Sequence, residues 1–423
     1  MEQRIYANFD LLFEEGTTEG YRIRVVGSPA GEATGTFLPP FTEAEFDRLM
    51  RLIRQGAERN RRFESRRRLA ARQLGDGLFR SAFDGDIGRC YRASLAEIEH
   101  RGEGLRIRLR LADAPELIDL PWELLYDAQS DSFLGLSVWT PIVRYLELPA
   151  PVKPVGAFPP LRILVMISQP KSVEPLDVEE EWRRLRSAVK EVETEGLVSA
   201  TRLPDATLLS LQRALRDEDF HIFHFIGHGS FDTAHEDGVL VLEDGEGGER
   251  LVSARDLGAF LRDQRSLGLV ILNTCSSATN SRRDPFTGSA QSLVLAGIPA
   301  VVAMQAPISD SAAIQFTSEF YGAIAHGHGV DTALGEARRS LFGLGHDTEW
   351  ATPVLYMRSR DGAIFDMATA PHSSTSRPRS GPRKPPTPPD PVGRERTRPR
   401  TEQTTKPTPA EPPGGIPDAI LDT

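Results

Sequence analysis

Short apolar runs alternate with helical patterns through the second half of the chain. Each run has the length of a strand, and the residues between runs place their apolar side chains at helical spacing. Alternation of this kind is typical of a mostly parallel sheet with helices on both faces. The strand-like runs are LRILVMIS (161–168), 197–203, HIFHFIG (221–227), LGLVILN (267–273), IPAVVAMQ (298–305) and TPVLYMR (352–358). The pattern predicts an α/β domain over 161–366.

The first 150 residues have a less regular pattern, which predicts a smaller α+β region. Its role is either to regulate the second half or to recruit a substrate. Strand-like pieces fill 1–40, and a helical pattern follows from Pro40 to about Gln73, with Thr42 and Glu45 spaced as a capping box. The proline-rich segment 151–160 can continue neither a helix nor a sheet, so it is predicted to be a linker.

Residues 367–423 contain many prolines, arginines, serines and threonines and few large apolar side chains. Such a composition cannot bury enough surface to offset its ordering entropy, so we predict a disordered tail. It is either a solvated spacer or a proline-rich ligand that tethers a partner.

The net charge of −10 argues against nucleic acid as a direct ligand. The arginines at 59–62 and 66–68 are either a surface for an anionic partner or the solvated face of a helix. No apolar run has the length of a membrane span, and two cysteines cannot form a disulfide framework. We therefore expect a cytoplasmic protein that does not bind membranes.

A thiol and an imidazole follow two of the predicted strands. His228 lies between two glycines after one strand, and Cys275 follows the Asn-Thr pair that ends another. Functional groups in open α/β sheets gather at the carboxyl ends of strands, so we expect the two side chains to lie close together. Cys275 is then a candidate nucleophile activated by His228, and the N–H groups of Gly229 and Cys275 are candidate oxyanion donors.

Other residues near these strands have simpler interpretations. Taken separately, His228 and Cys275 would be read as a core imidazole and a buried thiol. A metal site at His221 and His224 would need Asp232 and His235 as further ligands, and we expect no metal. Asp232 is instead a candidate to orient His228 or to line a pocket. No phosphate-binding glycine loop is present, so no nucleotide or other cofactor is expected.

Several motifs together resemble the CHAT domain, a caspase-like cysteine peptidase of the clan that includes metacaspases and separases. They are HFIGHG, LVILNTCSSA, SLVLAGIPAVVAMQAPISDSAA, TSEFYGAIAHG and ALGEARRSL. The resemblance implies a six-stranded caspase-like sheet and peptide-bond hydrolysis through an acyl-enzyme on Cys275. The caspase signature Q-A-C-x-G is absent, since Asn273-Thr274-Cys275-Ser276-Ser277 stands in its place.

The resemblance also implies a substrate pocket. Asp310 is placed like the acidic pocket residue of separase-type members, and Asn273 stands where metacaspase-like members often carry an acid. If Asp310 lines a partly desolvated pocket, it favours cleavage after Arg or Lys. Otherwise Asp310 is the N-cap of a helix over 311–326.

The expected function is that of a regulated cysteine endopeptidase acting on protein substrates in a bacterial defence, signalling or cell-death system. A sensor or regulatory partner would bind through the N-terminal region or the proline-rich tail. The alternative is a catalytically silent caspase-like scaffold that only binds other proteins.

Overall fold

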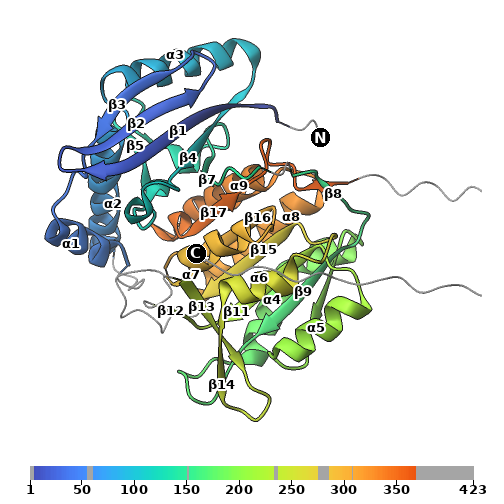
Figure 1. The fold of residues 1–423 in the computed structure, drawn as a ribbon. Helices are drawn as coiled ribbons and strands as arrows, with labels where there is room; N and C mark the ends of the chain where they lie inside the picture. The colour runs from blue at the N-terminus through green and yellow to red at the C-terminus, as the bar shows by residue number, and fades with distance from the viewer. Residues whose placement is uncertain are drawn as a thin grey trace, which may run out of the picture. The chain divides into compact units, whose positions relative to one another are not determined.

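The apolar runs predicted as strands form part of a mixed sheet of eleven strands (Figure 1). This computed structural model describes residues 4–54, 61–149, 152–232, 237–274, 285–306 and 308–367. In spatial order the strands are β10 (Val198–Arg202), β9 (Leu161–Ile167), β11 (Ile222–Gly227), β15 (Leu269–Thr274), β16 (Ala300–Met304), β17 (Pro353–Met357), β7 (Ile142–Tyr145), β4 (Gly104–Arg110), β1 (Tyr6–Thr17), β2 (Gly20–Gly27) and β3 (Ala33–Phe37). Three neighbouring pairs are antiparallel, namely β16–β17, β1–β2 and β2–β3, and the others are parallel.

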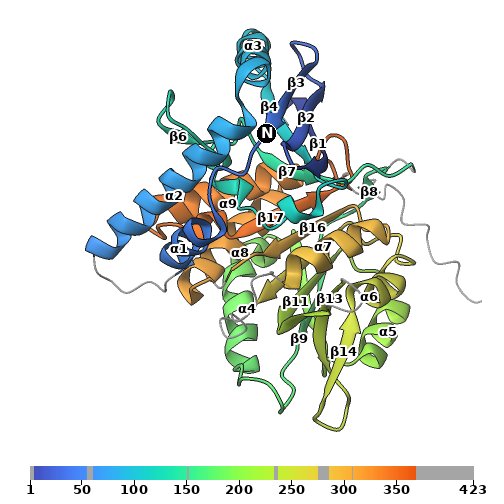
Figure 2. The same ribbon diagram turned by 60° about the vertical axis from the view of Figure 1, so that its left-hand side comes forward.

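Helices cover both faces of the sheet, as the sequence pattern predicts, with α4 and α8 on one side of β9 and β11 and α6 and α7 on the other (Figure 2). The helices are α1 (Glu43–Arg54), α2 (Arg61–Ala82), α3 (Gly85–Arg101), α4 (Val178–Thr194), α5 (Leu208–Asp217), α6 (Ala254–Leu261), α7 (Pro285–Leu295), α8 (Asp310–Ala325) and α9 (Val330–Gly343). Within the described ranges, every helix is too short or too polar to cross a membrane.

Smaller elements surround the main sheet. A three-stranded antiparallel sheet follows β11, and two-stranded pairs join β5 to β6 and β8 to β18. These strands are β12 (Gly229–Asp232), β13 (Asp237–Glu243), β14 (Glu249–Ser253), β5 (Tyr126–Asp127), β6 (Ser132–Phe133), β8 (Val155–Gly156) and β18 (Phe365–Asp366). Single 3₁₀ turns are η1 (Pro115–Leu117), η2 (Trp122–Leu124), η3 (Leu134–Leu136) and η4 (Glu349–Ala351).

The sheet continues beyond the six strands that the sequence predicts for the second half of the chain. Those six are β10, β9, β11, β15, β16 and β17, and β17 also pairs with β7, which comes from the N-terminal region. The predicted linker contributes β8, which pairs with β18 near the end of the described chain. Hydrogen bonding between strands therefore crosses the predicted boundary at 151–160. The predicted tail, 367–423, lies outside the described residues except for Met367.

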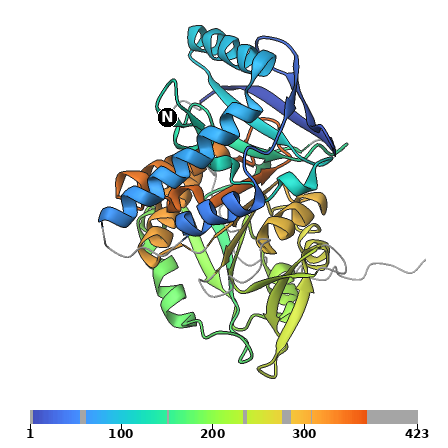
Figure 3. The ribbon, with the colours of Figure 1, turned by 90° about the vertical axis from the view of Figure 1, so that its left-hand side faces the viewer.

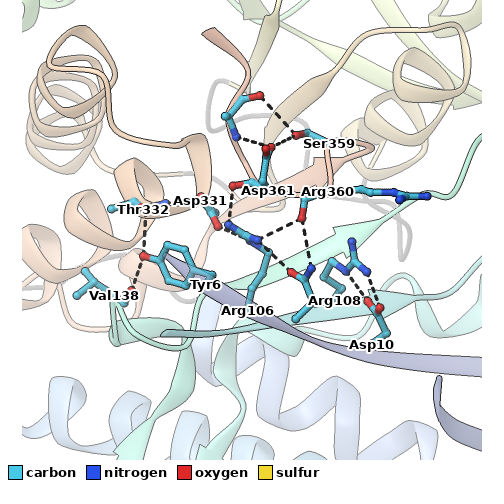
Figure 4. Close-up of polar contacts among 12 residues, drawn as sticks. Tyr6, Asp10, Arg106, Arg108, Val138, Asp331, Thr332, Ser359, Arg360 and Asp361 are labelled. Carbon is cyan, nitrogen blue, oxygen red and sulfur yellow. Dashed lines mark hydrogen bonds and ion pairs between the residues drawn. The ribbon is translucent and has the colours of Figure 1, made fainter. Parts of the chain in front are cut away.

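A buried ion pair connects the N-terminal strand β4 to helix α9 of the second half (Figure 4). Arg106 on β4 lies 2.5 Å from Asp331 on α9, and each side chain is only 1% exposed. The Arg106 guanidinium also donates to Asn8 Oδ1 at 3.0 Å and to the carbonyls of Arg360 and Asp361 at 3.2 and 2.8 Å. A buried guanidinium needs this many acceptors, because each unpaired donor costs free energy. The two regions are thus held together by charge as well as by strand pairing.

Local sequence signals explain the ends of several helices. Before α1, Glu45 N–H donates to Thr42 Oγ1 and Thr42 N–H donates to Glu45 Oε2, at 3.4 and 3.0 Å, so the predicted capping box forms. The sequence pattern missed α3, in which short polar residues interrupt the apolar spacing. This helix ends at Gly102 in a left-handed conformation with φ +66°.

Candidate active site

The two strands that precede His228 and Cys275 are neighbours in the sheet. Strands β11 and β15 pair in parallel, with Ile226 opposite Asn273 and Gly227 opposite Thr274. The apolar residues of both strands are buried in the core. In the sequence, His228 follows Gly227 and Cys275 follows Thr274, the last pair of the two strands. Cys275 lies outside the described residues.

The ring of His228 is buried and held in one orientation. The residue is 6% exposed, and its Nε2 lies 3.0 Å from the carbonyl oxygen of Glu174. A carbonyl can only accept a hydrogen bond, so Nε2 carries the hydrogen. In the neutral imidazole the other nitrogen, Nδ1, then has the lone pair and is the proton acceptor. Sequence reasoning missed Glu174, because a backbone carbonyl leaves no signal in the side-chain pattern.

The backbone around His228 is held by β13. The N–H of Val241 donates to the His228 carbonyl at 3.0 Å, and Gly229 pairs with Leu240. The hydrogen bond from Val241 to His228 lies beside this pair. Gly229 and Leu240 therefore form an antiparallel pair whose two residues exchange no hydrogen bonds with each other. The N–H of Gly229 is therefore not donated to Leu240.

Asn273 lies at the end of β15, on the same face of the sheet as Ile226. Its side-chain Oδ1 is buried and has no hydrogen-bond partner among the residues that the structure describes. A buried acceptor without a partner is costly, and such groups are typical of sites that are completed by a ligand. Asp232 is part of β12 opposite Asp237, but its side chain lies outside the described residues.

Asp310 is the first residue of α8, and its environment differs from both interpretations made from the sequence. The N-cap is Ser309, whose hydroxyl accepts from Ala312 N–H at 3.4 Å. The side chain of Asp310 is 68% exposed and lies 2.7 Å from Arg184 Nη2 on α4. The expectation of a partly desolvated carboxylate is therefore wrong. Arg184 was not identified from the sequence, because it comes from a helix more than a hundred residues earlier.

Arg184 lies among several acidic side chains. It donates to Glu180 and Glu181 at 3.0 and 2.7 Å, in addition to its ion pair with Asp310. Burial raises the pKa of the Glu181 carboxyl, and the nearby charge of Asp310 raises it further. Glu349 accepts from both the N–H and the hydroxyl of Ser309, at 3.2 and 2.7 Å, and so anchors the start of α8. This edge of the sheet is acidic and suits a cationic group.

His221, just before β11, and His224 on β11 are neutral buried residues. His221 Nδ1 accepts from Arg162 N–H at 2.9 Å, and His224 Nδ1 lies 2.8 Å from the Tyr321 hydroxyl. Burial lowers the pKa of His221 to about 4 and that of His224 to about 3. Among the described residues, no group of three His, Cys, Asp or Glu side chains is arranged to hold a metal ion. His235, named above as a possible ligand, lies outside them.

Cys90, the other cysteine, is a structural residue. Its thiol is buried on α3, 3.3 Å from the Ser28 hydroxyl and 3.6 Å from the Gly31 carbonyl. No imidazole is among the hydrogen-bonding partners of its sulfur. Cys90 therefore serves as an internal reference for the reactivity of Cys275.

Comparison with known proteins identifies the family. The model of the CHAT domain matches residues 85–375, more than half of the chain. No curated protein matches the chain in sequence. The match begins at α3 and so includes part of the N-terminal region as well as the predicted peptidase domain.

Solved structures of cysteine peptidases match the chain with low similarity. The Arg-specific cysteine proteinase gingipain R (RgpB) matches with a TM-score of 0.43 and 10% identity over 70% of each chain. The complex of the pro- and mature domains of Porphyromonas gingivalis RgpB has a TM-score of 0.40 and 9% identity over 78% of each chain. Separase from Saccharomyces cerevisiae, in complex with securin, has a TM-score of 0.33 and 16% identity over 78% of this chain. The match spans 21% of the separase chain. The chain belongs to the CHAT domain family.

Proposed function

We propose that this chain is a cysteine endopeptidase that hydrolyses protein substrates, with Cys275 as nucleophile and His228 as general base. The observation that carries the proposal is the parallel register of β11 and β15, which brings Gly227 beside Thr274. The next residues in the sequence are His228 and Cys275. The bond from His228 Nε2 to Glu174 adds support, because it leaves Nδ1 as the proton acceptor.

In the proposed reaction, His228 Nδ1 takes the thiol proton as the sulfur of Cys275 attacks the carbonyl carbon of the scissile bond. The N–H groups of Gly229 and Cys275 donate to the oxyanion that forms. Collapse breaks the C–N bond, and the imidazolium gives its proton to the departing amine. Water, deprotonated by the same imidazole, then hydrolyses the thioester and regenerates the thiol.

The rival function is a scaffold that keeps the fold without catalysis, and thiol reactivity separates the two. With iodoacetamide, we expect Cys275 to be alkylated rapidly well below pH 8.5, because an imidazolium partner favours the thiolate. His228→Ala should return the alkylation of Cys275 to the pH dependence of an ordinary thiol. Mass spectrometry of the alkylated peptides follows both cysteines, with buried Cys90 as the slow internal reference. Identical pH profiles for Cys275 in the two proteins would favour the scaffold.

In the same proposal, Asp310 gives a modest preference for Arg or Lys at P1, the substrate residue whose carbonyl is attacked. The substrate cation has to compete with Arg184 for an exposed carboxylate, and exposed ion pairs contribute little. We expect Asp310→Asn to lower kcat/KM for Arg substrates by roughly threefold to tenfold, with little change for Leu substrates. Ser311→Ala, in the same turn, is the control. An equal loss for Arg and Leu substrates would mean that Asp310 only stabilises the start of α8.

The biological setting proposed for this activity is a bacterial defence, signalling or cell-death system. In such a system a sensor or regulatory partner would control the peptidase. The acidic edge of the sheet and the extended N-terminal part of the sheet offer surfaces for such control.

A further inference from the structure

The loop between β9 and α4, residues 168–177, carries the carbonyl group that binds the ring of His228. It begins at the carboxyl end of β9, the strand next to β11. Glu174, which supplies the carbonyl, is exposed. A surface loop usually moves more than the sheet beneath it. The contacts of this loop therefore decide whether the carbonyl stays where His228 Nε2 can donate to it.

Gln169 closes the base of the loop. Its side-chain oxygen accepts a hydrogen bond from Leu176 N–H at 2.5 Å, and its side-chain nitrogen donates to the Pro170 carbonyl at 3.1 Å. The main-chain N–H of Gln169 donates to the carboxylate of Glu243 on β13 at 3.2 Å. One half-buried side chain thus joins the beginning of the loop to its end, on either side of Glu174.

The β13–β14 hairpin, drawn in yellow-green in Figure 3, holds the outer part of the loop. Lys171 N–H donates to the Gly247 carbonyl at 3.2 Å. A Cβ atom at Gly247 would lie 2.8 Å from Lys171 Nζ, so glycine permits this close approach. The hydroxyl of Ser172 donates to the carboxylate of Glu249 at 2.9 Å. The hairpin therefore holds the loop from outside, while Gln169 closes it from within.

The position of the loop bears directly on the tautomer of His228. The residue is only 6% exposed, so its Nε2–H needs an acceptor within the protein. The Glu174 carbonyl is this acceptor, at 3.0 Å. If the carbonyl moves away, the hydrogen is no longer held on Nε2 and the tautomer with the hydrogen on Nδ1 becomes populated. In that tautomer Nδ1 has no lone pair and cannot accept a proton.

We propose that Gln169 is a positioning residue for His228. Its two side-chain hydrogen bonds keep the loop closed, and the closed loop keeps the Glu174 carbonyl within reach of Nε2. This role rests on the proposed function, because the proposed reaction uses the lone pair of Nδ1. If Gln169 only filled space, the loss of its hydrogen bonds would leave the tautomer of His228 unchanged.

The first test uses nitrogen NMR, which distinguishes the imidazole nitrogen that carries the hydrogen from the one with the lone pair. The full chain with Cys275→Ala contains isotope-labelled histidine and is measured at alkaline pH, where an imidazole is neutral. Gln169→Met removes both side-chain hydrogen bonds but keeps a long side chain. Gln264→Met is the matched control, because Gln264 is also half-buried and donates to a backbone carbonyl, that of Leu215. The loss of signals in His228→Ala assigns them.

In the parent protein we expect one form of His228, with the hydrogen on Nε2. Gln169→Met should populate the other tautomer, so that the signals of the two nitrogens shift toward each other, and Gln264→Met should leave them unchanged. Circular dichroism checks that each variant is folded. Gln169→Asn, which shortens the side chain by one methylene and keeps its polarity, is a second variant with the same expected result. Unchanged nitrogen signals in the folded Gln169 variants would overturn the proposal.

The second test measures cleavage kinetics with Cys275 intact. Because the lost hydrogen bonds hold the base rather than the substrate, Gln169→Met should lower kcat by about threefold to tenfold and leave KM unchanged. A loss confined to KM would overturn the proposal, since the loop would then bind the substrate. A wild-type chain that cleaves no peptide would reject the proposed function instead, and the NMR comparison would still decide the role of Gln169.

Discussion

Cys275→Ala and His228→Ala should each reduce kcat/KM for peptide cleavage by on the order of 10⁴-fold or more. Loss of the thiol removes the only group proposed to form the acyl-enzyme. Loss of the imidazole leaves the thiol mostly protonated and the departing amine without a proton donor. Because the two groups act as one unit, the double variant should be little worse than either single variant. Rates of cleavage of a peptide library, followed by mass spectrometry, measure all three.

Cys90→Ala is the control for this prediction. Its thiol packs against Ser28 in the N-terminal region, away from β11 and β15, so cleavage should continue at the wild-type rate. Wild-type activity in Cys275→Ala or His228→Ala would reject the dyad. Additive losses in the double variant would mean that the two residues act in separate steps.

The second large effect concerns the buried ion pair between Arg106 on β4 and Asp331 on α9. Asp331→Asn keeps the shape of the side chain but leaves the Arg106 charge buried with only neutral acceptors. We expect the free energy of unfolding to fall by about 3–5 kcal/mol, because the remaining buried charge keeps its desolvation cost and loses the attraction that offset it. Urea denaturation of the full chain measures the change.

Glu147→Gln provides the matched control. Its partner Arg110 is on the same strand as Arg106, but the Arg110–Glu147 pair is partly exposed. Exposed pairs contribute less than about 1 kcal/mol, so this variant should unfold at nearly the wild-type urea concentration. If Asp331→Asn has an equally small effect, the buried charges do not hold the N-terminal strands to α9.

The sequence predicted the elements whose signals are local. Strand β11 has a mostly apolar run, and α4 has acidic residues in its first turn, where they favour helix formation. The capping box of Thr42 and Glu45 also formed as expected. Each of these features depends on residues within a few positions of one another.

The features that the sequence did not predict depend on distant partners. Arg106 alternates with apolar residues in β4, which gives no sign that its charge is buried against Asp331, 225 positions later. The acceptor for His228 is the backbone of Glu174, and any residue type offers such a carbonyl. Asp310 was correctly placed at the start of a helix, but its pairing with Arg184 arises only when α4 packs against α8.

The central claim is that Cys275 forms a covalent bond with the carbonyl group of the substrate, with the help of His228. A library of peptidyl acyloxymethyl ketones, which alkylate the nucleophile of cysteine peptidases, tests this claim most directly. After trypsin digestion, the account predicts an adduct on the peptide 266–282, at Cys275, in the wild-type chain and little or none in His228→Ala. An adduct on Cys90 instead, or equal labelling of Cys275 in the two proteins, would contradict it.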